Sequence, residues 1–321
     1  MRQNNLVFLE NRLRKRYKHL KKWARKNKIF AYRLYNKDIP EFPLAVDLYE
    51  NKEDAKTYVI LTFYKQPADK TEDLEAMWIK DRVSICAKIL DIPEENIFVK
   101  MRERKKALSQ YEKIAEKEKT ILVEEHDNLF KINLSNYIDT GLFLDHRNLR
   151  LIVKNEAKDK SVLNLFCYTA SFSVHAASAG ASLVDSVDLS NTYLEWAKEN
   201  FLLNKLEGEN FSFIKSDVIQ FLKSCKKKYD LIILDPPTFS NSKSTTTILD
   251  INRDYEELIK RTYALLNPDG CLYFSSNSKS LKVELENFSF AKEMQEITKQ
   301  TISEDFLGKR PHRSWKIVKT P

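Results

Sequence analysis

The segment 229–239 reads YDLIILDPPTF and joins an apolar run to a rigid turn. The apolar half has the length and composition of a fully buried strand. Pro236 and Pro237 fix φ and restrict the residue before each of them, so the backbone of the turn is stiff. The carboxylate of Asp235 can bind the polar edge of a flat ring, and Phe239 can stack on its face. These four residues predict a catalytic pocket for a base, although a proline turn after any parallel strand would look similar.

Apolar strands and helices alternate on both sides of this segment from about residue 161 onward. The expected strands are 162–168, 183–189, 211–215, 229–234 and 271–276, and the expected helices between them are 171–179, 191–204, 218–224 and 251–266. Repeated βα units with apolar strands predict a parallel sheet covered on both faces. The fold class is therefore α/β and Rossmann-like, and ligands are expected beyond the carboxyl ends of the strands.

Polar residues stand at these strand ends. Asp188 ends the second strand, where a carboxylate can bind the two hydroxyls of a ribose, and Ser190 can cap the next helix. Asp217 follows the third strand, where it can accept a hydrogen bond from an adenine amino group or simply cap the following helix. An adenosine cofactor accounts for this set. NAD is the rival, but the first turn has Ala170 where a closing Gly is usual and lacks the G-x-G-x-x-G pattern.

A further segment, 136–147, precedes the first strand and is broken by Gly141. A helix is expected from Leu142 onward, with Asp145 and Arg147 on its first turns. The segment could be a surface helix with an ion pair. It could also be a lid over the cofactor, with the guanidinium of Arg147 against the cofactor's carboxylate.

Composition narrows the class of partner and the compartment. The chain has 321 residues, a net charge of +8 and a pI near 9.0, which favours an acidic partner such as nucleic acid. The four cysteines form no C-x-x-C pair and indicate reduced thiols in a cytoplasmic protein. No apolar stretch is long enough for a membrane span, no signal peptide is expected, and no metal site is predicted.

The first part of the chain has a different pattern. Residues 12–28 hold ten basic and no acidic residues, with apolar residues at helical spacing. This helix could be a solvated lysine-rich surface, or it could dock on phosphates and supply affinity without sequence choice. Further strands and one helix follow, with a second basic cluster at Arg102, Arg104, Lys105 and Lys106. Residues 1–130 are therefore predicted to form a small α+β domain that binds RNA, and residues 131–321 the Rossmann-like domain.

Several long motifs occur in a fixed order. They are NRLRK at 11–15, basic text at 102–111, YIDTGLFLDHR at 137–147, NLFCYT at 164–169, VDLSNTYLEWA at 187–197 and DPPTFSNS at 235–242. Together they resemble the RlmK family, the C-terminal half of the bacterial RlmKL fusion, from about residue 11 to the C-terminus. The resemblance implies a freestanding class I methyltransferase that uses S-adenosylmethionine and acts on guanine N7 of 23S ribosomal RNA or its precursor. Ala170 departs from the family's usual Gly.

The same resemblance implies a set of cofactor-binding residues. They are Tyr137, Asp145, Arg147, Asn164, Phe166, Tyr168, Thr169, Ala170, Asp188, Leu189, Ser190, Ser216, Asp217 and Val218.

The methyl acceptor is narrowed by a missing cysteine. Relatives of this architecture that methylate cytosine C5 need a thiolate to attack C6, and they carry it just after the fifth strand. Here 274–278 reads FSSNS. Guanine N7 needs only alignment with the methyl group. Guanine N2, adenine N6 and a non-catalytic RNA-binding assembly factor stay open as alternatives.

Overall fold

The computed structural model describes residues 2–64, 72–102, 118–137, 139–240 and 248–321. It divides into two compact units. The N-terminal unit comprises Met1–Asp127 and Lys131–Thr140, and the C-terminal unit comprises Asn128–Phe130 and Gly141–Pro321. Within the described residues, no helix combines the length and apolar character needed to cross a membrane.

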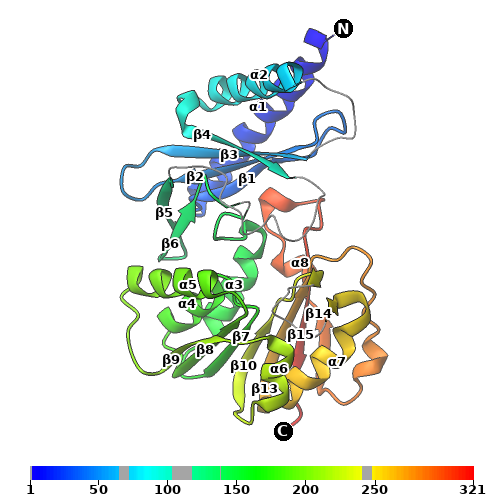
Figure 1. The fold of residues 1–321 in the computed structure, drawn as a ribbon. Coiled ribbons are helices and arrows are strands. Elements are labelled where there is room, and N and C mark those ends of the chain that lie inside the picture. Colours follow the sequence, from blue (N-terminus) through cyan, green and yellow to red (C-terminus); the bar gives the residue numbers. More distant parts are fainter. Residues whose placement is uncertain (1, 65–71, 103–117, 138, 241–247) are drawn as a thin grey trace. The chain divides into compact units, whose positions relative to one another are not determined.

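The N-terminal unit is built on a four-stranded sheet in the order β1-β2-β3-β4 (Figure 1). Its elements are α1 (Arg2–Lys26), β1 (Ala31–Asn36), β2 (Leu44–Glu50), β3 (Thr57–Tyr64), α2 (Glu72–Leu90), η1 (Glu94–Asn96), β4 (Ile97–Arg102) and β5 (Thr120–Glu125). The first three strands are antiparallel, and β4 joins β3 in parallel after the α2 crossover. Figure 1 shows α1 and α2 on the same face of this sheet.

Helix α1 packs on the sheet through an apolar stripe. Leu9, Leu13, Leu20 and Ala24 are buried and recur at helical spacing. The helix begins ten residues before the expected start at residue 12, because Leu9 continues the same stripe toward the N-terminus. Its predicted end near residue 27 is confirmed. Of the second basic cluster, Arg104, Lys105 and Lys106 lie outside the described residues.

The C-terminal unit follows the predicted alternation and then adds a segment of mixed structure. Its elements are η3 (Leu144–His146), α3 (Arg147–Glu156), β7 (Ser161–Leu165), α4 (Ser171–Ser178), β8 (Leu183–Asp188), α5 (Asn191–Leu203), β9 (Phe211–Lys215), α6 (Val218–Ser224), β10 (Tyr229–Leu234), β11 (Phe239–Ser240), β12 (Leu249–Asp250), α7 (Ile251–Ala264), β13 (Leu266–Ser276), η4 (Leu285–Phe288), β14 (Glu293–Glu296), α8 (Thr298–Thr301), η5 (Glu304–Phe306) and β15 (Arg313–Val318). The strand β6 (Asn128–Asn133) pairs with β5, and the division between the units passes through it.

The seven-stranded sheet has the order β14-β15-β13-β10-β7-β8-β9. Strands β13, β10, β7, β8 and β9 are parallel, whereas β15 runs antiparallel to both of its neighbours. The strand order reverses between β7 and β10, where Leu165 pairs with Leu234. This is the switch point at which open α/β sheets bind ligands. The predicted Rossmann-like fold is confirmed.

Helices cover both faces of this sheet (Figure 1). Leu163 and Leu165 of β7 belong to the same buried cluster as residues of α6 and α7. Asn164 lies between them and points to the opposite face, where its side chain bonds to Ser173 of α4. The alternation of side chains along a strand therefore places α4 and α7 on opposite faces, and the strand ends lie between two helical layers.

Candidate active site

The turn after β7 has an unusual backbone. Phe166, Tyr168 and Ala170 have φ of +57°, +52° and +60°. Left-handed residues that alternate with others turn backbone N–H groups to one side, as in anion-binding nests. Ala170 is also the residue before α4, with ψ of 33°. The left-handed backbone at this position explains why a Gly was expected there.

Gly141 is tied to this turn from the other side. Its N–H donates to the hydroxyl of Tyr168 at 2.9 Å, and its carbonyl accepts from the hydroxyl of Thr169 at 2.6 Å. Gly141 has φ of +101°, and a Cβ atom there would lie 2.3 Å from the ring of Trp196. Only glycine fits, so the segment that begins at Gly141 is held against the turn.

Asp188 ends β8 and faces the same turn. One carboxylate oxygen accepts from the N–H of Tyr168 at 2.9 Å, and the other accepts from the N–H of Ser190 at 2.9 Å. Burial raises the pKa of Asp188, and these N–H groups together with that of Leu189 act in the opposite direction. Ser190 caps α5, as predicted, because its hydroxyl accepts from the N–H of Tyr193. Each oxygen of Asp188 keeps a lone pair for a ligand.

The end of β9 carries Ser216, Asp217 and Val218. The carboxylate of Asp217 accepts from the N–H of Gln220 at 3.0 Å, so Asp217 caps α6. The N–H of Ser216 donates to the carbonyl of Asp188 at 3.0 Å, which joins the two strand ends. Val218 is buried. The capping alternative for Asp217 is thus confirmed, and any contact with adenine stays a prediction.

Three expected ligands have other places in the structure. The amide of Asn164 lies inside the unit, donating to Ser173 at 2.9 Å, because even-numbered residues of β7 face α4. Arg147 is only 2% exposed, and its guanidinium lies 3.2 Å from a carboxylate oxygen of Asp305. The lid expected at Arg147 is instead a buried ion pair. Tyr137 belongs to the N-terminal unit, where its carbonyl accepts from Lys100.

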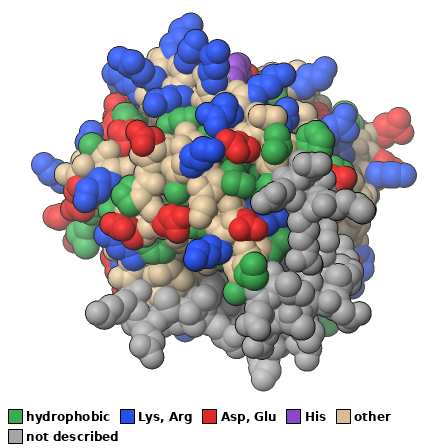
Figure 2. All heavy atoms as spheres, turned by 90° about the horizontal axis from the view of Figure 1, so that it is seen from above, with side chains coloured by type: hydrophobic (Ala, Val, Ile, Leu, Met, Phe, Trp, Pro, Cys, Tyr) green, Lys and Arg blue, Asp and Glu red, His purple; other side chains and the backbone are tan. Residues whose placement is uncertain are grey.

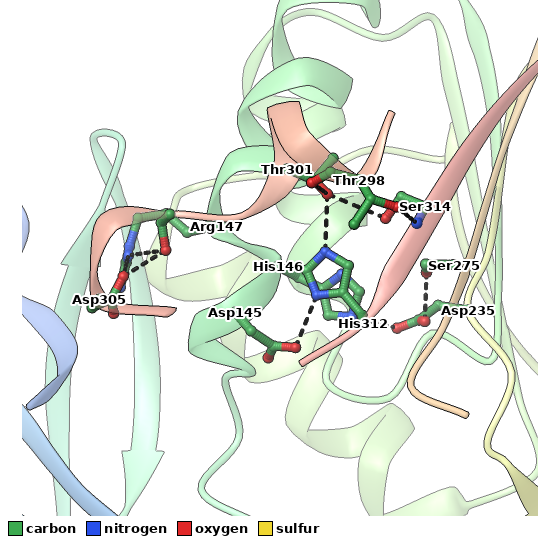
Figure 3. Close-up of polar contacts among 11 residues, drawn as sticks. Asp145, His146, Arg147, Asp235, Ser275, Thr298, Thr301, Asp305, His312 and Ser314 are labelled. Carbon is green, nitrogen blue, oxygen red and sulfur yellow. Dashed lines mark hydrogen bonds and ion pairs between the residues drawn. The ribbon is translucent and has the colours of Figure 1, made fainter. Parts of the chain in front are cut away.

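Asp235 stands at the end of β10 with two groups against its carboxylate (Figure 3). The hydroxyl of Ser275 donates to Oδ1 at 2.5 Å, and Nε2 of His146 lies 3.4 Å from Oδ2. The Asp235 side chain is 25% exposed, so a ligand can reach it. Pro236 is buried, whereas Pro237 is exposed and Phe239 is 50% exposed. A partly open carboxylate thus lies four residues before an open aromatic ring.

Sequence reasoning missed two histidines beside Asp235. The rings of His146 and His312 are stacked, with centroids 4.2 Å apart and an interplanar angle of 15°. Nδ1 of His312 lies 3.0 Å from Asp145, and its Nε2 lies 3.0 Å from the hydroxyl of Thr301 (Figure 3). His146 stood inside a quoted motif but carried no expected role. His312 had no sequence signal, since it lies far along the chain in the segment that was not assigned.

Asp145, His146 and His312 also place three metal-ligating side chains close together, within the described residues. A metal ion must lie near the plane of each imidazole that binds it, about 2.0–2.1 Å from the nitrogen. The two rings are almost parallel and stacked, so their in-plane lone pairs do not point to a common position. The geometry therefore fits a stacked, hydrogen-bonded pair better than a metal centre.

Two buried cysteines lie in the same unit. Burial raises the pKa of Cys271 to about 12, and burial with the neighbouring charge of Asp188 raises the pKa of Cys167 well above its usual range. Both side chains are only 5% exposed. The nucleophilic form of cysteine is the thiolate, so neither residue has the properties of a nucleophile.

Comparisons with known proteins agree with this architecture. The family model for S-adenosylmethionine-dependent methyltransferases matches residues 47–300. The chain is similar to the ribosomal RNA large subunit methyltransferase K of Neisseria meningitidis serogroup B, with 44% identity over 96% of this chain and 86% of that protein. It is also similar to the methyltransferase K/L of Magnetococcus marinus, with 44% identity over 98% of this chain and 43% of that protein. The chain thus spans less than half the length of this K/L relative.

Solved structures support the fold. A SAM-dependent methyltransferase from Streptococcus mutans has a TM-score of 0.74 and 22% identity, over 97% of this chain and 81% of that one. A methyltransferase complexed with SAH has a TM-score of 0.71 and 22% identity, over 96% of this chain and 81% of that one. The family model and the relative matched over most of its length agree with the motifs. The chain belongs to the RlmK family of S-adenosylmethionine-dependent methyltransferases.

Proposed function

We propose that this protein transfers a methyl group to N7 of a guanine in 23S ribosomal RNA or its precursor. The observation that carries the proposal is the partly open carboxylate of Asp235, held by Ser275 at the end of β10 with exposed Phe239 close by in sequence. Substrate RNA is named for the relatives as ribosomal RNA of the large subunit. With its free cysteines, the enzyme is proposed to act in the cytoplasm.

The cofactor is proposed to bind along the ends of β7, β8 and β9. Asp188 binds the ribose hydroxyls, and the left-handed turn at Phe166, Tyr168 and Ala170 offers N–H groups to the methionine carboxylate. The residues proposed around the ribose and adenine are Leu189, Ser190, Ser216, Asp217 and Val218, and Thr169, Asp145 and Tyr137 stay proposals from the family resemblance. Asn164 and Arg147 are proposed to support the site from inside the fold.

Bound S-adenosylmethionine supplies the methyl group that is transferred. Guanine N7 carries a lone pair and no proton, so the reaction needs alignment and exclusion of water rather than a general base. Asp235 is proposed to accept hydrogen bonds from N1–H and the 2-amino group of guanine, and Phe239 to stack on the base. In structured RNA the base must leave its stack to reach this pocket.

The cysteines favour this acceptor over cytosine C5. A cytosine enzyme needs a thiolate near the base. Cys271 and Cys167 are buried thiols with raised pKa values, and Ser275 and Ser276 stand where the family comparison expected the nucleophile. Guanine N2 and adenine N6 are separated from N7 by the product alone.

The N-terminal unit is proposed to supply most of the affinity for RNA. The exposed basic residues of α1 and the residues just after it are Arg14, Lys15, Lys18, Lys21, Lys22, Arg25, Lys26 and Lys28. Arg12 and Arg16 instead lie against Asp38, at 2.8 Å and 4.0 Å. Figure 2 shows Lys and Arg side chains gathered along one edge of the face in view, with acidic side chains scattered elsewhere on it. Phosphate binding by such a surface adds affinity without sequence choice.

The test is a map of modified nucleotides in ribosomal RNA from cells that lack the protein. The proposal expects the loss of one 7-methylguanosine from 23S ribosomal RNA and its return when the gene is restored. Restoration by Asp235→Ala should fail. If Asp235→Ala restores the modification, or if cells without the protein lose nothing while the purified protein binds no S-adenosylmethionine, the assembly-factor alternative is favoured.

A further inference from the structure

The carboxylate of Asp235 is approached by one group at each oxygen. Ser275 donates to Oδ1 at 2.5 Å, and Nε2 of His146 lies 3.4 Å from Oδ2. The second distance is longer than an ordinary N–H···O hydrogen bond. Contacts of this kind in sites without substrate often tighten when the reacting complex forms. The two groups come from the end of β13 and from η3, so two separate segments meet at one carboxylate (Figure 3).

The proton of His146 can be assigned to one nitrogen. Nδ1 is buried and has no hydrogen-bond partner. A proton on Nδ1 would be a buried donor without an acceptor, which costs about 1–3 kcal/mol. A proton on Nε2 faces the carboxylate of Asp235. Burial is the largest cause that lowers the pKa of His146; Asp235 and Asp145 oppose it, and His312 and Arg150 add to it. Neutral His146 with its proton on Nε2 follows from these surroundings.

The ring of His146 is held in place on two sides. It stacks on His312, and its centroid lies 5.8 Å from the ring of Phe172 in an edge-to-face arrangement. His312 is itself held at both nitrogens, by Asp145 and by Thr301. His146 is only 5% exposed and His312 only 2% exposed. The direction of the Nε2–H bond is therefore set by packing.

We propose that His146 is a positioning residue for the methyl acceptor: it aims the Asp235 carboxylate and keeps it an ionised hydrogen-bond acceptor, while His312 holds the ring of His146. The inference rests on the proposed function, in which Asp235 receives the N–H groups of the base. It gives a purpose to the segment between β13 and β15, which carries Thr301 and His312 to the strand ends. His146 and His312 touch neither the base nor the cofactor in this proposal.

The experiment compares two substitutions at His146 with a matched histidine. His146→Leu removes the donor and keeps a similar volume, whereas His146→Gln keeps an N–H donor. His175→Gln is the control, because His175 is also buried in the C-terminal unit but bonds to Asn128. The measurements are methyl transfer from tritiated S-adenosylmethionine to a 23S ribosomal RNA transcript, and cofactor affinity by calorimetry. We expect kcat to fall about tenfold or more for His146→Leu, with cofactor affinity unchanged within about twofold. His146→Gln should recover most of the rate, and His175→Gln should keep it.

A double substitution shows whether His146 acts through Asp235. Residues that act as a unit give losses that do not add. The variant with both His146→Leu and Asp235→Ala should therefore be no slower than Asp235→Ala alone. The inference is overturned by additive losses, by a wild-type rate in His146→Leu, or by a parallel loss of cofactor binding in both His146 variants. A fully active Asp235→Ala, or a product other than 7-methylguanosine, would instead reject the proposed function.

Discussion

Asp188 binds backbone N–H groups on both sides of the cofactor turn, so it orders the turn as well as offering a carboxylate. A hydrogen bond to a charged group contributes about 1.5–3 kcal/mol. Asp188→Ala should weaken the binding of S-adenosylmethionine at least about tenfold, which calorimetry measures directly. Ser190→Ala removes only the helix cap and is the control, because its hydroxyl is committed to the N–H of Tyr193. Unchanged affinity in Asp188→Ala removes this residue from the site.

Gly141 and Gly308 separate crowding from backbone strain. Both have positive φ, +101° and +77°, but a Cβ at Gly141 meets Trp196 at 2.3 Å whereas one at Gly308 meets nothing within 4 Å. Gly308→Ala should lower stability only by the cost of a left-handed alanine, about 1–2 kcal/mol. Gly141→Ala adds overpacking, about 1–3 kcal/mol more, and should also weaken cofactor binding. Thermal unfolding of both variants measures the difference, and equal midpoints would show that Trp196 moves aside freely.

His146 predicts how stability responds to acid. Its pKa is lowered in the folded protein, mainly by burial, so the unfolded chain binds its proton at a higher pH than the folded one. The free energy of unfolding should therefore fall as the pH drops below about 6.5, the ordinary histidine value. His146→Gln removes this proton uptake and should flatten the loss between pH 6.5 and 5.5. Urea unfolding at these two pH values tests this, and an identical pH dependence in both proteins contradicts it.

At the scale of elements, α1 carries the strongest charge pattern of the chain. Reversal of Lys15, Lys18 and Lys22 to Glu should weaken RNA binding and flatten its dependence on salt, because each phosphate contact contributes a slope of about 0.9. The matched control reverses Lys205, Lys223 and Lys226, which are exposed in the C-terminal unit and change the net charge equally. Filter binding at several salt concentrations measures both sets. An equal loss in the control would mean that net charge matters and α1 does not.

The elements also show which parts of the fold sequence patterns predict. The apolar strands 183–188, 211–215 and 229–234 were predicted within a residue of their observed bounds, because burial on both faces leaves an uninterrupted apolar run. The edge strand β14 was not predicted, since EMQE is mostly exposed and has no apolar run. Strand β15 was also missed, because the basic residues Arg313 and Lys316 interrupt its buried positions.

At the scale of the whole molecule, the site is assembled from segments far apart in sequence. The bond between His312 and Asp145 joins residues 167 positions apart, and the bond between Ser275 and Asp235 joins residues 40 apart. Local patterns indicated Asp188 and Asp235 because strand ends in a parallel sheet meet at one edge. The same patterns placed Asn164 and Arg147 in the site, but side-chain direction and the ion pair with Asp305 depend on packing that only the folded chain shows.

The central claim is the acceptor atom, and nucleoside mass spectrometry tests it most directly. Purified protein is incubated with S-adenosylmethionine and 23S ribosomal RNA from cells that lack the enzyme, and the digested RNA is analysed beside a reaction with Asp235→Ala. The account predicts one new 7-methylguanosine with the wild-type protein and at least about a tenfold slower reaction with Asp235→Ala, because the carboxylate orients the base. The appearance of 5-methylcytosine, N2-methylguanosine or N6-methyladenosine in place of 7-methylguanosine would contradict it.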